Sequence, residues 1–127
     1  MIEGLFNQTT YVAMKKMLDV NELRHRAIAS NLANIETPGY KRMDVAPNFA
    51  ASLSEAVGAG ASPEAIEQLK PELARDPHAV AVRADGNSVQ MENELLQLSR
   101  NFVEHQLESQ MVTGSMLRLR LAITGKG

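Results

Sequence analysis

The apolar residues at both ends of this chain alternate at spacings of three and four, and no proline interrupts either run. The first run extends from about Thr10 to Ile35, and its positions are Tyr11, Met14, Leu18, Asn21, His25, Ile28, Leu32 and Ile35. The second extends from about Ser88 to Ile123, and its positions are Met91, Leu95, Leu98, Phe102, His105, Ser109, Val112, Met116, Leu119 and Ile123. Such spacing places a stripe of side chains on one helix face, where it suits packing against another helix. The sequence therefore predicts two long helices and a mainly α fold.

We expect the whole chain, residues 1–127, to form one domain. An N-terminal helix (10–36) and a C-terminal helix (88–123) should fold back on each other as an antiparallel coiled-coil hairpin. The segment between them (37–87) has a different character, with turns, loops, one short helix and a short strand. A compact four-helix core is the alternative, but the weakly apolar middle segment does not favour it.

One register of this hairpin places Ile35 opposite Met91 and Asn21 near His105. A buried layer of Asn and His costs stability, yet polar residues at such positions fix the register of a helix pair.

The C-terminal helix has recognisable start and stop signals. Asn87 or Ser88 is a natural N-cap, and Gln90 completes an approximate capping box with Asn87. Acidic residues at the start and arginines near the end suit the helix dipole; they are Glu92, Glu94, Arg118 and Arg120. Gly125 marks the expected stop.

Three parts of the middle segment have local signals. The Ala-, Gly- and Ser-rich stretch Ala51–Ser62 predicts a mobile loop. Residues 63–70 predict two helical turns, with Ser62 as cap and Pro63 at the first position. The apolar stretch Ala79–Arg83 predicts a short strand that a turn at residues 85–86 closes.

A sharp turn follows the N-terminal helix. The sequence Thr37-Pro38-Gly39-Tyr40 suits a type II turn, which needs positive φ at its third residue. Asn31 and Asn34 lie on one helix face beside this turn, where their amides can bind loose backbone groups.

The composition excludes several classes of function. There is no cysteine, and the 13 basic and 15 acidic side chains give a net charge of −2. Without a basic excess, nucleic acid is not expected as a partner. No apolar run approaches the length of a membrane span, so membrane insertion is not expected either. The three histidines, His25, His78 and His105, lack the spacing of a metal site, and the glutamates suit a solvated helix face. We expect no enzyme, no metal and no cofactor.

The C-terminal helix is more apolar than one stripe requires. Six further apolar residues lie off the stripe described above: Leu96, Val103, Leu107, Met111, Leu117 and Leu121. A helix that is apolar on several faces must be buried on several faces, and in so short a chain neighbouring subunits would supply that burial. This favours self-assembly.

The stretch Ala29–Tyr40 resembles the Ala-Ser-Asn-Leu-Ala-Asn…Thr-Pro-Gly-Tyr signature of bacterial flagellar rod and hook proteins. The family motif corresponds to Asn31, Leu32, Asn34, Thr37, Pro38, Gly39 and Tyr40. Residues 40–45 and 83–94 are also similar to stretches of short rod proteins.

The resemblance implies a structural subunit of the proximal rod of the flagellar basal body. Such a subunit assembles with copies of itself and with other axial proteins into the torque-transmitting drive shaft around the export channel. The implied partners are other rod proteins (FlgC, FlgF and FlgG-like), the FliE-like ring adaptor and the flagellar type III export gate. The implied location is the rod where it crosses the periplasm, reached without a cleaved signal peptide.

The resemblance also assigns roles to individual residues. The residues expected to pack the helices in the assembly are Met14, Leu18, Ile28, Ile35, Leu95, Leu98, Phe102, Val112, Met116 and Leu119. Phe49, followed four residues later by Leu53, is similar to the short export-gate motif of early flagellar substrates. The alternatives are another short rod protein such as FlgC, a soluble helical adaptor or chaperone of flagellar export, and a small metal- or ligand-binding helical bundle.

Overall fold

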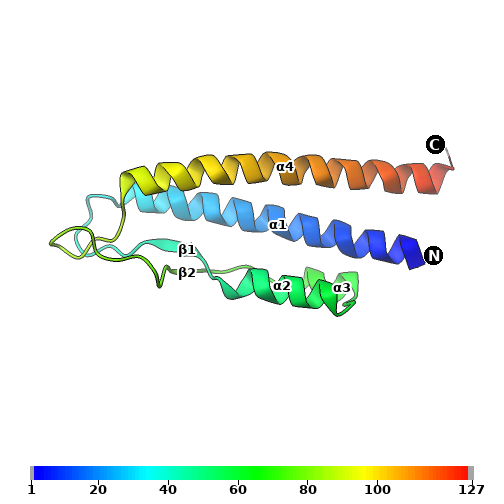
Figure 1. The fold of residues 1–127 in the computed structure, drawn as a ribbon, viewed down its shortest axis with the longest axis horizontal. Coiled ribbons are helices and arrows are strands. Elements are labelled where there is room, and N and C mark those ends of the chain that lie inside the picture. Colours follow the sequence, from blue (N-terminus) through cyan, green and yellow to red (C-terminus); the bar gives the residue numbers. More distant parts are fainter. Residues whose placement is uncertain (1, 126–127) are drawn as a thin grey trace.

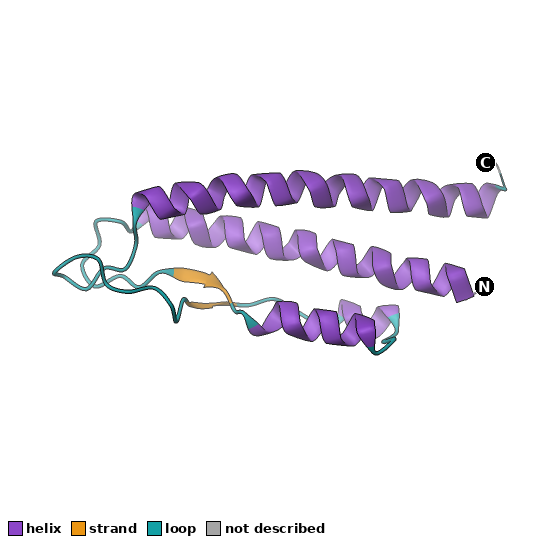
Figure 2. Ribbon diagram, in the orientation of Figure 1, coloured by secondary structure: helices purple, strands orange, loops and turns teal. Residues whose placement is uncertain are grey.

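The computed structural model describes the backbone of residues 2–125, and the side chains of residues 8–118, 120, 121 and 123–125. The chain is mainly helical (Figure 2). Its elements in chain order are α1 (Ile2–Ala33), β1 (Met43–Val45), α2 (Asn48–Gly58), α3 (Pro63–Glu67), β2 (Leu73–Arg75) and α4 (Met91–Thr124).

The long helix α1 is the middle layer of the molecule. It packs against α4 on one side and against α2, α3 and the strands on the other (Figure 1). The helices α1 and α4 are antiparallel, so both termini lie at one end and the loops at the other. This confirms the prediction of two long terminal helices that pack together.

The bounds of these helices differ from the predicted ones by a few residues. Helix α1 begins at Ile2 rather than near Thr10, and it ends at Ala33, where Asn34 begins a turn. Helix α4 begins at Met91 and ends at Thr124. Its C-cap is Gly125 with φ of 67°, as the sequence predicted.

The apolar core lies between α1 and the α2–α3 pair. Its buried members are Val20 of α1, Phe49 and Leu53 of α2, and Ile66 of α3. The prediction of a mobile loop over Ala51–Ser62 is therefore wrong for most of its length, because α2 extends to Gly58. The small residues of α2 weaken its periodicity, but Phe49 and Leu53 bury one face of it against α1 and so stabilise it.

The short helix α3 confirms its predicted cap but ends at Glu67 rather than at residue 70. The Ser62 hydroxyl accepts a hydrogen bond from the Ala65 amide at 3.2 Å, and Pro63 occupies the first turn.

The predicted strand over Ala79–Arg83 is wrong. The structure instead pairs β1 with β2 in antiparallel register, with Asp44 opposite Ala74. Val80 and Val82 are 76% and 45% exposed, which shows that these β-branched residues lie on the surface rather than in a ladder. Strand propensity alone does not form a strand without a partner edge.

Candidate assembly site

The family motif forms the junction at the loop end of the molecule. Gly39 has φ of 72°, and the Tyr40 amide donates to the Thr37 carbonyl at 3.3 Å, as the predicted turn requires. The Asn34 amide donates back to the Ser30 carbonyl at 2.8 Å and so holds the last turn of α1.

Asn31 ties α1 to β1 and to α4. Its side chain is fully buried, and its carbonyl accepts from the Met43 amide at 2.9 Å while its amide donates to the Met43 carbonyl at 2.9 Å. The same side chain accepts from the Tyr40 hydroxyl at 3.2 Å and donates to Glu94 at 3.3 Å. This bears out the expectation that the amide of Asn31 binds backbone groups.

A buried ion pair joins the chain after the turn to the start of α4. The Arg42 guanidinium donates through Nε to the Glu94 carboxylate, and the two side chains are 5% and 0% exposed. Nη1 of Arg42 also contacts Asp76 at 2.9 Å and Asp44 at 3.2 Å. Burial alone would lower the pKa of Arg42, but the hydrogen bonds and charges of Glu94 and Asp44 outweigh it and raise that pKa.

Asn87 connects the two ends of the middle segment through hydrogen bonds. It is fully buried, and its amide donates to the carbonyls of Asn34, Ile35 and Thr37 at 3.1, 3.1 and 2.8 Å. Its carbonyl accepts from the Val89 amide at 2.8 Å. The predicted N-cap at Asn87 or Ser88 is therefore wrong: Gln90 holds that position without a side-chain cap. The side chains of both residues form other hydrogen bonds instead. Asn87 forms those described above, and the Ser88 hydroxyl accepts from the Arg42 amide at 2.8 Å.

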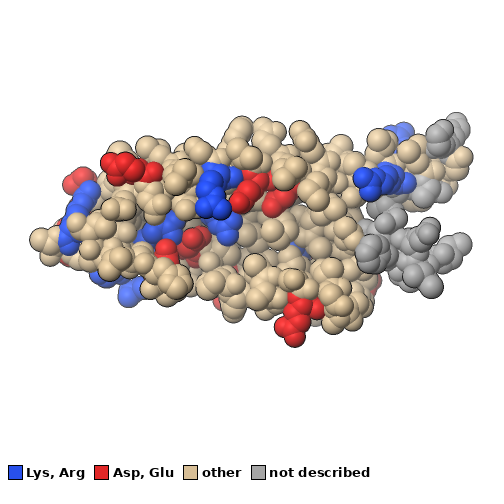
Figure 3. Space-filling view, viewed as in Figure 1, with Lys and Arg blue, Asp and Glu red and all other residues tan. Residues whose placement is uncertain are grey.

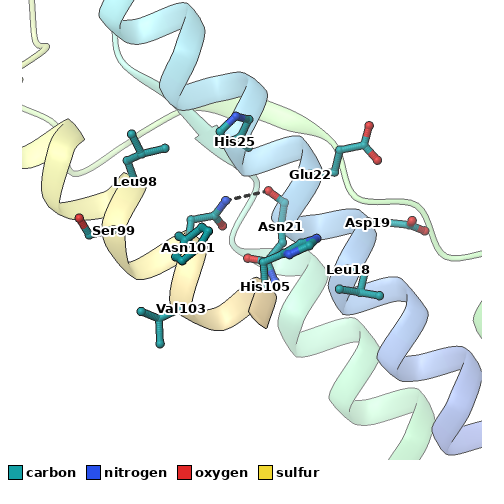
Figure 4. A pocket seen from close by; sticks show the side chains of 11 residues that line it. Leu18, Asp19, Asn21, Glu22, His25, Leu98, Ser99, Asn101, Val103 and His105 are labelled. Atoms are coloured by element: carbon teal, nitrogen blue, oxygen red, sulfur yellow. Dashed lines mark hydrogen bonds between the residues drawn. The ribbon is translucent and has the colours of Figure 1, made fainter. Parts of the chain in front are cut away.

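The contact between α1 and α4 is polar at its centre (Figure 4). The Asn101 amide donates to the Asn21 carbonyl at 3.0 Å, and the Asn21 side chain donates to Glu108. Asn101 and Glu108 lie one helical turn before and after His105. Asn21 therefore contacts α4 on both sides of His105, whose own side chain is exposed. Among the described residues, the buried side-chain oxygens of Asn21 and Asn101 have no hydrogen-bond partner.

Glu108 titrates unusually at this contact. Burial raises its pKa above the ordinary value, and the Glu104 charge adds to the rise. The hydrogen bond from Asn21 and the charges of His105 and Arg24 oppose the rise without cancelling it.

The residues predicted to pack the helices divide into two groups in the single chain. Ile28 is buried, and five others are half-buried: Met14, Leu18, Ile35, Leu98 and Val112. Leu95, Phe102 and Met116 are 49%, 63% and 53% exposed. The side chain of Leu119 lies outside the described residues.

All six apolar residues off the predicted stripe of α4 are exposed, namely Leu96, Val103, Leu107, Met111, Leu117 and Leu121. Figure 3 shows uncharged side chains along much of this edge of the molecule, with the charged side chains gathered in clusters. Helix α4 thus presents one polar row, Glu94, Asn101 and Glu108, to α1 and many of its large apolar residues to the outside.

Phe49 and Leu53, the candidate export-gate residues, are 7% and 5% exposed in the core. In the folded chain their side chains are packing residues.

Within the described part of the chain, no helix combines the length and the apolar character that crossing a membrane requires. No group of three metal-ligating side chains gathers there either.

Several known proteins resemble this chain, although no family model matches it. The flagellar basal body rod protein FlgB of Cereibacter sphaeroides (strain ATCC 17029 / ATH 2.4.9) is 31% identical over 121 residues, which cover 86% of this chain and 89% of that protein. FlgB of Aeromonas hydrophila is 29% identical over 118 residues, covering 86% and 88%. FlgB of Escherichia coli (strain K12) is 25% identical over 117 residues, covering 80% and 83%.

The chain belongs to the FlgB family. As a FlgB-family chain it is a structural component of the flagellar basal body rod and not an enzyme. The buried network is therefore interpreted as scaffolding, and the exposed face of α4 is the candidate assembly site.

Sequence reasoning missed the buried partners in this FlgB-family chain. Glu94 was expected on a solvated face, yet it is fully buried. A signal was present, because Glu94, Asn101 and Glu108 are spaced by seven residues and therefore share one helix face. That polar row is the side of α4 that meets α1.

Proposed function

We propose that this chain is a subunit of the proximal rod that assembles with copies of itself and with other axial proteins into the torque-transmitting drive shaft around the export channel. One observation carries the proposal: a FlgB-family chain presents large apolar side chains along α4 to solvent, from Met91 to Ile123. Monomeric proteins rarely leave so many large apolar side chains of one helix uncovered.

The partners we propose are FlgC, FlgF and FlgG-like rod proteins and the FliE-like ring adaptor. Delivery occurs through the flagellar type III export gate, and the rod position lies across the periplasm. Phe49 and Leu53 act as the gate signal only in the unfolded chain, because folding buries both.

Residues 1–127 act in the rod as one domain, with α1 and α4 as an antiparallel coiled-coil hairpin. The polar contact of Asn21 with Asn101 and Glu108 supports this, because polar residues at a helix seam fix its register. The motif residues set the exit from α1, and Leu95, Phe102 and Met116 face neighbouring subunits rather than the interior of their own chain.

Deletion of the gene in its own bacterium tests the proposal. We expect loss of the rod and of swimming, and recovery of both when the wild-type chain is supplied from a plasmid. The variant Leu107→Ser, altered at a 58% exposed position of α4, should recover swimming poorly. The control Val80→Ser, altered at a 76% exposed loop position, should recover it fully. Normal rods without the gene would contradict the proposal.

A further inference from the structure

The exposed apolar residues of α4 form two separate stripes. Stripe A consists of Met91, Leu95, Phe102, Met116 and Ile123. Stripe B consists of Leu96, Val103, Leu107, Met111, Leu117 and Leu121. At 3.6 residues per turn the stripes lie about 130° apart around the helix, and stripe B lies nearly opposite the polar row that meets α1.

We propose that stripe A of one chain binds stripe B of a second copy, so that each α4 contacts two other copies through two different surfaces. This inference rests on the proposed function and specifies which surfaces meet.

Stripe A lies beside a concave surface. A groove of about 950 Å³ runs between α1 and α4, and its walls include Leu18, His25, Leu98 and Phe102 (Figure 4). A smaller notch of about 360 Å³ near the termini is lined by Tyr11, Met116 and Ile123. Two helices contribute to the walls of both hollows, and the groove combines apolar side chains with polar ones such as Asn21, Ser99 and His105. An amphipathic helix of another molecule can bind in a groove of this kind.

Stripe B lies farther from the α1 contact than stripe A does, about 140° around α4 from the polar row against about 80°. Its side chains are 39–64% exposed, although Val103 also borders the groove and Leu107 and Met111 border a hollow that Met14 of α1 shares. Among the described helices, α4 alone exposes a long row of large apolar side chains of this kind. Stripe B is therefore the segment of a second copy that fits the groove.

The charges beside the two surfaces favour the same pairing. Asp19 and Glu22 line the groove and stay 57% and 64% exposed, although Lys16 and Arg26 contact them. Arg100 and Arg118 flank stripe B, and neither has an ion pair within the described part of the chain. Pairing stripe B with stripe B would bring these arginines together, whereas pairing it with the groove brings one of them to the carboxylates of Asp19 and Glu22.

The exposed area also requires more than one neighbour. A half-exposed large apolar side chain offers roughly 100 Å², and a typical partner contributes roughly 800 Å² to a stable interface. Both stripes together exceed that amount and lie on different faces, so one neighbour cannot cover them. Two unlike surfaces that bind each other give a ring or an open filament rather than a two-fold dimer.

Two blocked variants of the full chain test this pairing. Phe102→Asp blocks stripe A and leaves stripe B intact, and Leu107→Asp does the reverse. Both sites are exposed, at 63% and 58%, so each variant should keep the wild-type helicity by circular dichroism. Light scattering across a concentration series should show growing assemblies for the wild type and monomers for each variant alone.

The decisive sample is an equal mixture of the two variants. The intact stripe B of Phe102→Asp should bind the intact stripe A of Leu107→Asp and give a dimer that grows no further. The pair Leu95→Asp and Val103→Asp repeats the test at sites that are 49% and 64% exposed. Val80→Asp, outside both stripes, is the control and should assemble like the wild type.

Three results would overturn the inference. Dimers formed by each variant alone would mean that each stripe binds its own kind, and a mixture that stays monomeric would mean that stripes A and B do not bind each other. A wild type that stays monomeric at every concentration would exclude contact between copies. The gene deletion described above tests rod function separately. A chain that restores swimming but gives no mixed dimer would refute the pairing alone.

Discussion

The turn after α1 depends on one backbone conformation that most residues avoid. Gly39 has φ of 72°, and a Cβ placed there would meet the Asp85 carbonyl oxygen at an ordinary 3.7 Å. The cost of a side chain at this position therefore comes from the backbone and not from a steric clash.

Gly39→Ala should lower the free energy of unfolding by about 1 kcal/mol, because alanine is disfavoured at positive φ. Urea denaturation followed by circular dichroism measures it. Gly58→Ala is the matched control, since Gly58 has open space around its Cβ position and lies within α2. Equal stability of both variants would contradict a strained conformation at Gly39.

Glu108 makes the stability depend on pH. Its pKa is higher in the folded chain than the ordinary value, so the folded chain holds this proton more tightly than the unfolded chain does. The resulting contribution of Glu108 to the free energy of unfolding is fully present below the ordinary glutamate pKa of about 4.3. It is lost as the pH rises through the raised pKa of the folded chain. Relative to Glu108→Gln, the wild type should therefore lose stability as the pH rises from about 4 toward neutrality.

Urea midpoints of both chains across this pH range provide the measurement. As the pH rises, the urea midpoint of the wild type should fall relative to that of Glu108→Gln. A difference that stays constant would show that folding leaves the affinity of Glu108 for its proton unchanged.

Three residue roles that depend on local sequence were predictable, although the N-cap of α4 was not. Gly39, Ser62 and Gly125 each act through backbone groups close to them in the chain, and the structure places each as expected. Arg42 and Glu94 were not predictable as partners, since they are 52 positions apart and meet only when three segments converge. The motif around Asn31 was visible, but its bond to Glu94 was not.

At the scale of elements, the long helices were predictable and the short ones depended on context. Helix α4 has 34 residues, and its apolar spacing continues over most of them. So long a pattern identifies a helix even where a short stretch of it would not. Helix α2 has only 11 residues, many of them small, and its helical form depends on docking against α1. The strands β1 and β2 have three residues each, which is too short for an alternating pattern to be recognised in the sequence.

The cap of α3 is a test at this scale. Ser62→Ala should lower the free energy of unfolding by about 1 kcal/mol, because the Ala65 amide loses its side-chain acceptor. Hydrogen exchange should accelerate first at the start of α3. Ser54→Ala, at an exposed position within α2, is the control and should change little. Unaltered exchange in α3 would mean that the cap contributes nothing.

On the scale of the whole molecule, α1 holds two layers that scarcely touch each other. The core around Ile66 lies on one side of α1, and α4 lies on the other (Figure 1). The layers should therefore respond separately to damage in the core.

Ile66→Ala should cost about 3 kcal/mol, because Ile66 is fully buried and its truncation leaves a cavity. Amide exchange should accelerate in α2 and α3 and much less in α4. Ile123→Ala, at an 83% exposed position, serves as the control and should cost almost nothing. Equal acceleration in α4 would show that the layers unfold as one unit.

The junction between Arg42 and Glu94 has a consequence for the surroundings in which the chain can work. Dissolved ions weaken attractions between charges that face water, whereas they scarcely reach a pair that is 5% and 0% exposed. The position of the segment after the turn against the start of α4 should therefore be the same in fresh water and in brine. A motile cell that swims between habitats of different salinity would keep this joint unchanged.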